Sequence, residues 1–65
     1  MYEEFLEKEL LTVDEVAEIL YLGKNTVYNL LRSGELKGIR FGRVWRVPKE
    51  NIKMMIEEKV RMEKN

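Results

Sequence analysis

The chain has 65 residues, of which 45% are apolar and 37% are charged, and its formal net charge is zero. This length fits one small domain, which we expect to cover residues 1–65. The absence of cysteine and histidine excludes disulfides and ordinary zinc sites, and no apolar run reaches the ~18 residues of a membrane span. The acidic amino-terminal residues differ from a secretion signal, so we expect a cytoplasmic protein. We also expect no cofactor.

Helical periodicity dominates the first third of the chain. Residues 1–9 carry three apolar side chains at helical spacing, which predict a short helix: Tyr2, Phe5 and Leu6. Thr12 and Glu15 then form a capping-box pattern, so a helix should begin at Val13. Its core-facing positions recur at i, i+3, i+4 and i+7: Val13, Val16, Ala17 and Leu20.

A second apolar stripe follows after a short interruption. Val27, Leu30 and Leu31 lie at helical spacing, and Ser33-Gly34 supplies a stop signal. The small Ala17 stands where the two helices would approach, and the turn comes four residues later. These spacings over residues 12–32 match a helix-turn-helix, in which the second helix enters the major groove of DNA.

The period changes to two over residues 36–47, which predicts a β-hairpin with Gly42 in its loop. A three-residue loop would pair Phe41 with Trp45 on the inner face and leave Arg40 opposite Arg46 outside. A phosphate beside these two arginines would relieve their repulsion. Trp45 is then expected in the core.

A final helix is predicted over residues 48–62. Pro48 suits a first helical position, where the missing N–H costs nothing. Met55 continues the stripe of Ile52 and Ile56 and should be buried, whereas Met54 and Met62 lie off it and are available to another protein. The expected fold is α+β and mostly helical: a winged helix-turn-helix with a small hairpin wing and a carboxyl-terminal helix.

Charge is unevenly distributed along the chain. Residues 23–49 hold seven basic residues and one acid, whereas residues 1–22 hold seven acids and one lysine. A polyanion would meet one basic face and be repelled by the acidic back. The pattern therefore points to nucleic acid.

The start of the second helix and the hairpin supply the candidate contacts. Lys24 can donate to guanine, and Asn25 or Asn29 can pair with adenine, while the wing arginines suit phosphates or a narrow groove. The candidate DNA-binding residues are Lys24, Asn25, Thr26, Tyr28, Asn29, Arg32, Lys37, Arg40, Arg43 and Arg46. The simpler alternatives are a solvated helix face, a Tyr28 that covers the core edge, and an edge strand protected by charge.

No catalytic constellation accompanies these residues. Asp14 and Glu18 stand one helical turn apart, as two metal-binding carboxylates can, but no nucleophile, base or phosphate-cradling loop lies with them. We read them as a solvated face and expect neither a metal site nor an enzyme.

The segments LLTVDEVAEIL and NTVYNLLRSGELKGIRFGRVWRVPKENI resemble excisionase-type, MerR-like winged helix-turn-helix domains. The resemblance implies a recognition helix in the major groove, a wing on adjacent DNA, and no catalysis. Two positions depart from the family pattern. Tyr21 stands where glycine is common, and Gly23 replaces the usual serine, so we expect Gly23 to take the left-handed angles of the turn and the serine cap to be lost.

This reading predicts a sequence-specific, double-stranded DNA-binding protein, and most specifically an excisionase that bends attachment-site DNA. The expected partners are a site-specific recombinase (integrase) and further copies of the chain that bind DNA cooperatively; no membrane is involved. One alternative is a small transcriptional regulator that uses the same face. Another is a protein-interaction adaptor that no longer binds DNA.

Overall fold

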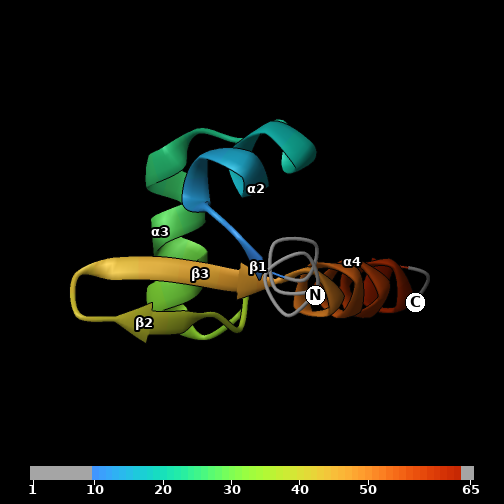
Figure 1. The fold of residues 1–65 in the computed structure, drawn as a ribbon. Helices are drawn as coiled ribbons and strands as arrows, with labels where there is room; N and C mark the ends of the chain where they lie inside the picture. Colours follow the sequence, from blue (N-terminus) through green and yellow to red (C-terminus); the bar gives the residue numbers. More distant parts are fainter. Residues whose placement is uncertain (1–9, 64–65) are drawn as a thin grey trace, which may run out of the picture.

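The computed structural model describes residues 10–63. Its elements are β1 (Leu10–Leu11), α2 (Val13–Leu20), α3 (Lys24–Ser33), β2 (Ile39–Phe41), β3 (Val44–Pro48) and α4 (Lys49–Glu63) (Figure 1). The predicted fold class is confirmed, since this region is mostly helical and carries a small sheet. The helix predicted from Tyr2, Phe5 and Leu6 lies outside the described residues.

The start of α2 is fixed by a capping box, as predicted. The Glu15 backbone N–H donates to the Thr12 hydroxyl at 3.1 Å, and the Thr12 backbone N–H donates to the Glu15 carboxylate at 2.9 Å. Two N–H groups that the first helical turn leaves without partners are therefore satisfied. Val13, Val16 and Ala17 are buried, so the predicted apolar stripe faces the core.

The turn after α2 differs from the prediction. Tyr21 takes the left-handed conformation (φ 56°, ψ 43°), whereas Gly23 is extended with φ −71°. The Tyr21 and Leu22 N–H groups donate to the carbonyls of Glu18 and Ala17, the pattern of a Schellman motif. These bonds fix the left-handed position immediately after the helix. The prediction that Gly23 carries it is wrong, because Gly23 serves as the extended N-cap of α3.

Helix α3 begins without a side-chain cap at Gly23, as the missing serine led us to expect. It buries Val27 and Leu31 and ends at Gly34, whose φ is 87° and whose N–H donates to the Leu31 carbonyl. The predicted stop at Ser33-Gly34 is therefore confirmed.

The hairpin loop has two residues, not the predicted three. Ile39 lies opposite Arg46, Arg40 opposite Trp45, and Phe41 opposite Val44. Gly42 has φ 64°, and Tyr21 is the only non-glycine residue with a positive φ between residues 10 and 63. A positive φ at the first loop residue alone matches a type II′ turn, which suits the twist of a hairpin.

This register also corrects the predicted faces of the sheet. Ile39, Phe41 and Val44 lie on the outer face, with 42%, 56% and 46% of their surfaces exposed. Arg40 shares the inner face with Trp45, so it does not face Arg46. The prediction was wrong because it assumed that both strands bury their apolar side chains, whereas the core reaches only the Trp45 and Val47 side of β3.

A third strand, absent from the sequence prediction, completes the sheet in the order β1-β3-β2. In β1, Leu10 pairs with Pro48 and Leu11 with Val47, both antiparallel. Pro48 therefore ends β3 and α4 begins at Lys49, one residue later than expected. This short strand fastens the chain before α2 to the base of the wing.

The core lies where α2, α3, β3 and α4 meet. Val16, Val27, Leu36 and Val47 are fully buried. Met55 and Ile52 close the core from α4, as predicted, whereas Ile56 is 42% exposed and Met54 and Met62 are exposed. Within residues 10–63, no helix is long and apolar enough to cross a membrane.

Candidate nucleic-acid interface

The exposed face of α3 carries the predicted recognition residues. The buried positions Val27 and Leu31 turn one side of the helix to the core. Helical periodicity then places four polar side chains away from the core, where they are exposed: Asn25, Thr26, Asn29 and Arg32. Lys24 lies in line with Val27 and Leu31, but it is exposed because it stands at the start of the helix. Tyr28 is half-buried and packs against the core, so its ring covers the core edge while lying beside this face.

A shallow hollow joins the start of α3 to the wing. It is lined by residues from the start of α2, from α3 and from the hairpin: Thr12, Val13, Asp14, Lys24, Tyr28, Arg43, Val44, Trp45 and Arg46. Three predicted cationic contacts, Lys24, Arg43 and Arg46, therefore surround one depression. The unequal charge distribution led us to expect these basic residues on one surface, which is suited to an anionic ligand. Asp14, from the acidic first third of the chain, was expected on the back but lines the same depression.

Lys24 makes an ion pair that the sequence did not reveal. Its Nζ atom lies 3.0 Å from Asp14 Oδ1, and the two side chains are 61% and 72% exposed. The hydrogen bond to Asp14, together with its negative charge, raises the pKa of Lys24 above its ordinary value. Ten residues separate the partners, and only the close approach of α2 and α3 brings them together.

Asn29, Arg32 and Tyr28 form a second linked group along α3. Arg32 Nη1 donates to Asn29 Oδ1 at 3.2 Å, and Arg32 Cζ lies 5.8 Å from the centre of the Tyr28 ring. The Asn29 oxygen is therefore engaged, whereas base recognition through an amide uses both its oxygen and its nitrogen. Asn25 is the better placed of the two asparagines for an adenine contact.

Two of the wing arginines, Arg40 and Arg46, are held by hydrogen bonds within the hairpin. Arg40 Nε donates to the Gly42 carbonyl at 3.0 Å, and Arg46 Nη1 donates to the Trp45 carbonyl at 2.9 Å. Arg40 Cζ lies 5.8 Å from the Trp45 ring, within range of a cation–π contact. These contacts restrict the guanidinium groups, so binding of an anion there would cost less conformational entropy.

Lys37 is placed apart from this group. It lines a different hollow with α4 residues that include Asn51 and Met54, and its carbonyl accepts a hydrogen bond from Asn51 Nδ2 at 2.8 Å. Of the predicted contacts, the hollow between α2, α3 and the wing thus collects Lys24, Tyr28, Arg43 and Arg46. The other predicted contacts do not line it: Asn25, Thr26, Asn29, Arg32, Lys37 and Arg40.

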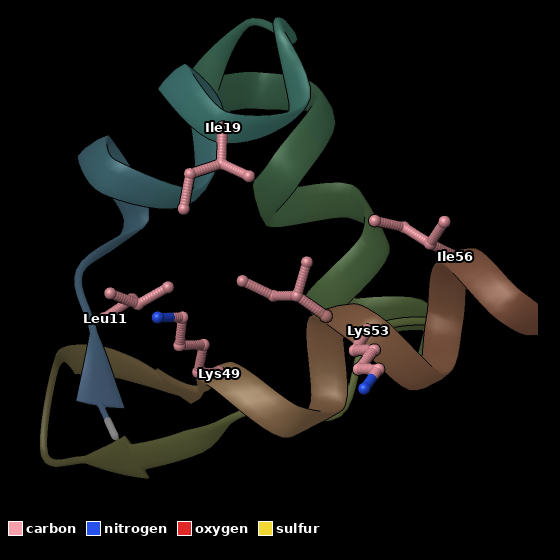
Figure 2. Close-up of a pocket in the computed structure, with 6 residues that line it drawn as sticks. Leu11, Ile19, Lys49, Lys53 and Ile56 are labelled. Atoms are coloured by element: carbon pink, nitrogen blue, oxygen red, sulfur yellow. The ribbon is translucent and has the colours of Figure 1, made fainter. Parts of the chain in front are cut away.

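A separate, mostly apolar groove lies between β1, α2 and α4. Figure 2 shows its lining, which is apolar except for two lysines: Leu11, Ile19, Lys49, Ile52, Lys53 and Ile56. None of these residues belongs to the cationic hollow. Their lysines provide matched controls for charge changes made at the wing.

Comparison with known proteins decides the family. Residues 10–60 match the family described as "Helix-turn-helix domain". The chain belongs to this family. The match spans all of the described elements from β1 into α4, so the helix pair and the wing together form a helix-turn-helix DNA-binding domain. No solved structure matches the chain.

Curated relatives agree with this family. The chain is 45% identical over 49 residues to "Putative DNA-binding protein Rv0500A" of Mycobacterium tuberculosis, covering 75% of this chain and 63% of the relative. It is 46% identical over 43 residues to a "Probable excisionase" of Saccharopolyspora erythraea, covering 66% of this chain and 44% of the relative. The chain thus spans less than two thirds of the length of either relative.

The described region offers no alternative centre built from metal ligands. Between residues 10 and 63, no group of three or more His, Cys, Asp or Glu side chains is placed to hold a metal ion. Asp14, considered from the sequence as one of two carboxylate ligands, is paired with Lys24.

Proposed function

We propose that this protein binds double-stranded DNA sequence-specifically and acts as an excisionase. In this role it bends attachment-site DNA and helps a site-specific recombinase to excise, and it performs no catalysis itself. The observation that carries the proposal is the cationic hollow, in which Lys24 at the start of α3 lies with Arg43 and Arg46 of the wing. The relative named "Probable excisionase" supports the specific role.

The proposal gives α3 the task of reading bases. Its start lies in the major groove, where Asn25 makes the paired contact with adenine. Thr26 and Asn29 lie on the same exposed face, and Arg32 reaches a phosphate further along the groove. Lys24, which shares the hollow with Arg43 and Arg46, contacts a phosphate beside that groove.

The wing supplies contacts that position the protein without reading sequence. Arg40, Arg43 and Arg46 contact phosphates or enter the adjacent minor groove, as charge and planar geometry favour. Lys37 extends this contact only if the DNA reaches the α4 side of the domain.

Several copies are needed for high specificity. A single module of this kind covers roughly 600 to 1,000 Å² of surface, which recognises few base pairs. We therefore propose that copies bind adjacent sites cooperatively, and that their combined bends present the attachment site to the integrase.

The first test is the dependence of DNA affinity on salt. If about five phosphates are contacted, log K should fall with log salt concentration with a slope near −4.5. Arg43→Gln or Arg46→Gln should each lower the magnitude by about 0.9, whereas Lys53→Gln, which removes the same charge in the apolar groove, should leave it unchanged. Weak binding that ignores salt would identify a protein-interaction adaptor instead.

The second test separates excisionase from transcriptional regulator. A binding site selected from random duplexes is placed at varied positions in a fragment, and bending is measured by electrophoretic mobility. The protein is then added to an excision reaction catalysed by a site-specific integrase. Bending together with stimulated excision supports the proposal, whereas specific binding without either effect favours the regulator.

A further inference from the structure

One carboxylate occupies an unexpected position in the cationic hollow. Asp14 is the only acidic residue among those that line it, and it stands beside Lys24, Arg43 and Arg46. A phosphate that approached these cations would be repelled by Asp14. The start of α2 therefore contains a group that opposes the ligand for which the rest of the hollow is suited.

The ion pair between Asp14 and Lys24 is open to exchange. The nitrogen and oxygen are 3.0 Å apart, but both side chains are mostly exposed to solvent. Exposed pairs of this kind are weak, because water screens them and both side chains lose freedom. A phosphate oxygen can therefore replace Asp14 as the partner of Lys24 without breaking a buried structural bond.

We infer that Asp14 competes with DNA phosphate for Lys24. Asp14 binds Lys24 in the free protein, and it is displaced when a phosphate enters the hollow beside Arg43 and Arg46. This inference rests on the proposed DNA-binding function and adds a residue that restrains it. The phosphate contact carries no sequence information. Asp14 therefore weakens binding to every duplex, and the base contacts of α3 supply a larger share of the affinity that remains.

The test needs no knowledge of the target site. Asp14→Asn is compared with the unaltered protein on a duplex of mixed sequence over a range of salt concentrations. The variant should bind roughly two- to five-fold more tightly at low salt, because the competing pair is lost. The salt slope should change little, because Lys24 neutralises the same phosphate in both complexes. A rise of about 0.9 in its magnitude would mean that Asp14 keeps Lys24 in the complex of the original protein, and would contradict the exchange.

Glu57→Gln is the matched control, because it removes one negative charge from α4, outside the hollow. Asp14→Ser is a second variant, and thermal unfolding establishes that each protein is folded. If both Asp14 variants raise the DNA affinity no more than Glu57→Gln does, the inference is overturned. If the unaltered protein binds no DNA at all, the proposed function fails instead.

A double-variant cycle determines whether Asp14 acts through Lys24. If Asp14 restrains Lys24, the gain from Asp14→Asn should be smaller in a Lys24→Gln background than in the original protein. An equal gain in both backgrounds would mean that Asp14 only repels the phosphate directly, and would contradict the exchange.

Discussion

Arg40 lies directly across the hairpin from Trp45, with its Cζ atom 5.8 Å from the centre of the indole ring. The contact allows a charged side chain to share the inner face of the sheet with the core, because the guanidinium lies over a half-buried aromatic ring. It also fixes the position of one wing arginine relative to the only tryptophan of the chain.

Replacing Arg40 should alter both DNA binding and the environment of Trp45. Arg40→Gln should lower the magnitude of the salt slope by about 0.9, whereas Arg40→Lys should retain the slope because it keeps the charge. Tryptophan fluorescence of the free proteins reports the loss of the contact. An unchanged slope in Arg40→Gln would show that Arg40 contacts no phosphate.

Asn25→Ala should relax base preference at one position of the site by about 1 to 3 kcal/mol. The amide of Asn25 is exposed at the start of α3, where it can donate and accept toward one adenine. Affinity is measured on duplexes that vary each base pair in turn. Arg43→Gln is the comparison, since it should weaken all of these duplexes equally; the same uniform loss in Asn25→Ala would reject its role in base reading.

Gly38→Ala should destabilise the fold by about 1 to 3 kcal/mol through overpacking. A Cβ atom at this position would lie 2.6 Å from Leu31 Cδ2 and 3.2 Å from Trp45 Cε3, and Leu31 is buried and unable to move freely. Denaturant unfolding measures the effect. At Gly23 an added Cβ meets no atom within 4 Å, so Gly23→Ser should instead stabilise α3 by a few tenths of a kcal/mol as a better cap.

Tyr21→Gly should stabilise the protein by roughly 0.5 to 1 kcal/mol. A non-glycine residue in the left-handed region costs about 1 to 2 kcal/mol, and glycine removes this strain. Part of the stabilisation is offset because glycine also increases the conformational entropy of the unfolded chain. The Tyr21 side chain is 94% exposed, so its removal loses little packing. Gly34→Ala, which places a side chain at φ 87°, should shift the unfolding temperature in the opposite direction.

The pair between Lys59 and Glu35 should make stability depend on alkaline pH. Lys59 Nζ lies 2.8 Å from Glu35 Oε2, and this hydrogen bond with its charge attraction raises the pKa of Lys59 above the ordinary 10.5. Because the folded-state pKa is the higher one, the stabilisation is complete below pH 10.5 and is lost as the pH rises through the raised value.

Thermal unfolding between pH 9 and 12 tests this dependence. Glu35→Gln should lose less stability over the interval than the original protein, because its Lys59 has no carboxylate partner. Glu57→Gln serves as the control and should follow the original protein. Parallel curves for all three would reject a contribution from the pair.

The sequence predicts best the elements whose causes are local. The capping box of Thr12 and Glu15, the apolar stripe from Val13 and the glycine stop at Gly34 all act within a few residues, so their outcome does not depend on the rest of the fold. The same reasoning placed the polar face of α3 correctly, because burying Val27 and Leu31 leaves only one orientation for that helix.

Tertiary contacts decide what the sequence prediction missed. The hairpin register depends on which face of the sheet meets the core, and alternation alone does not distinguish the burial of Phe41 from that of Trp45. Strand β1 has only two residues, which are too few to show the alternation of apolar and polar side chains that predicts a strand. The Asp14–Lys24 pair requires two helices to be placed against each other, so no spacing along the chain indicates it.

The two-residue loop between Phe41 and Val44 also limits how far the wing can reach. Strand β2 has three residues, and at about 3.3 Å per residue it projects only some 10 Å. In the proposed complex, an arm of this length would contact the duplex immediately beside α3. The spacing of the proposed neighbouring copies would then be set by the body of the domain, since the hairpin is too short to bridge a gap between them.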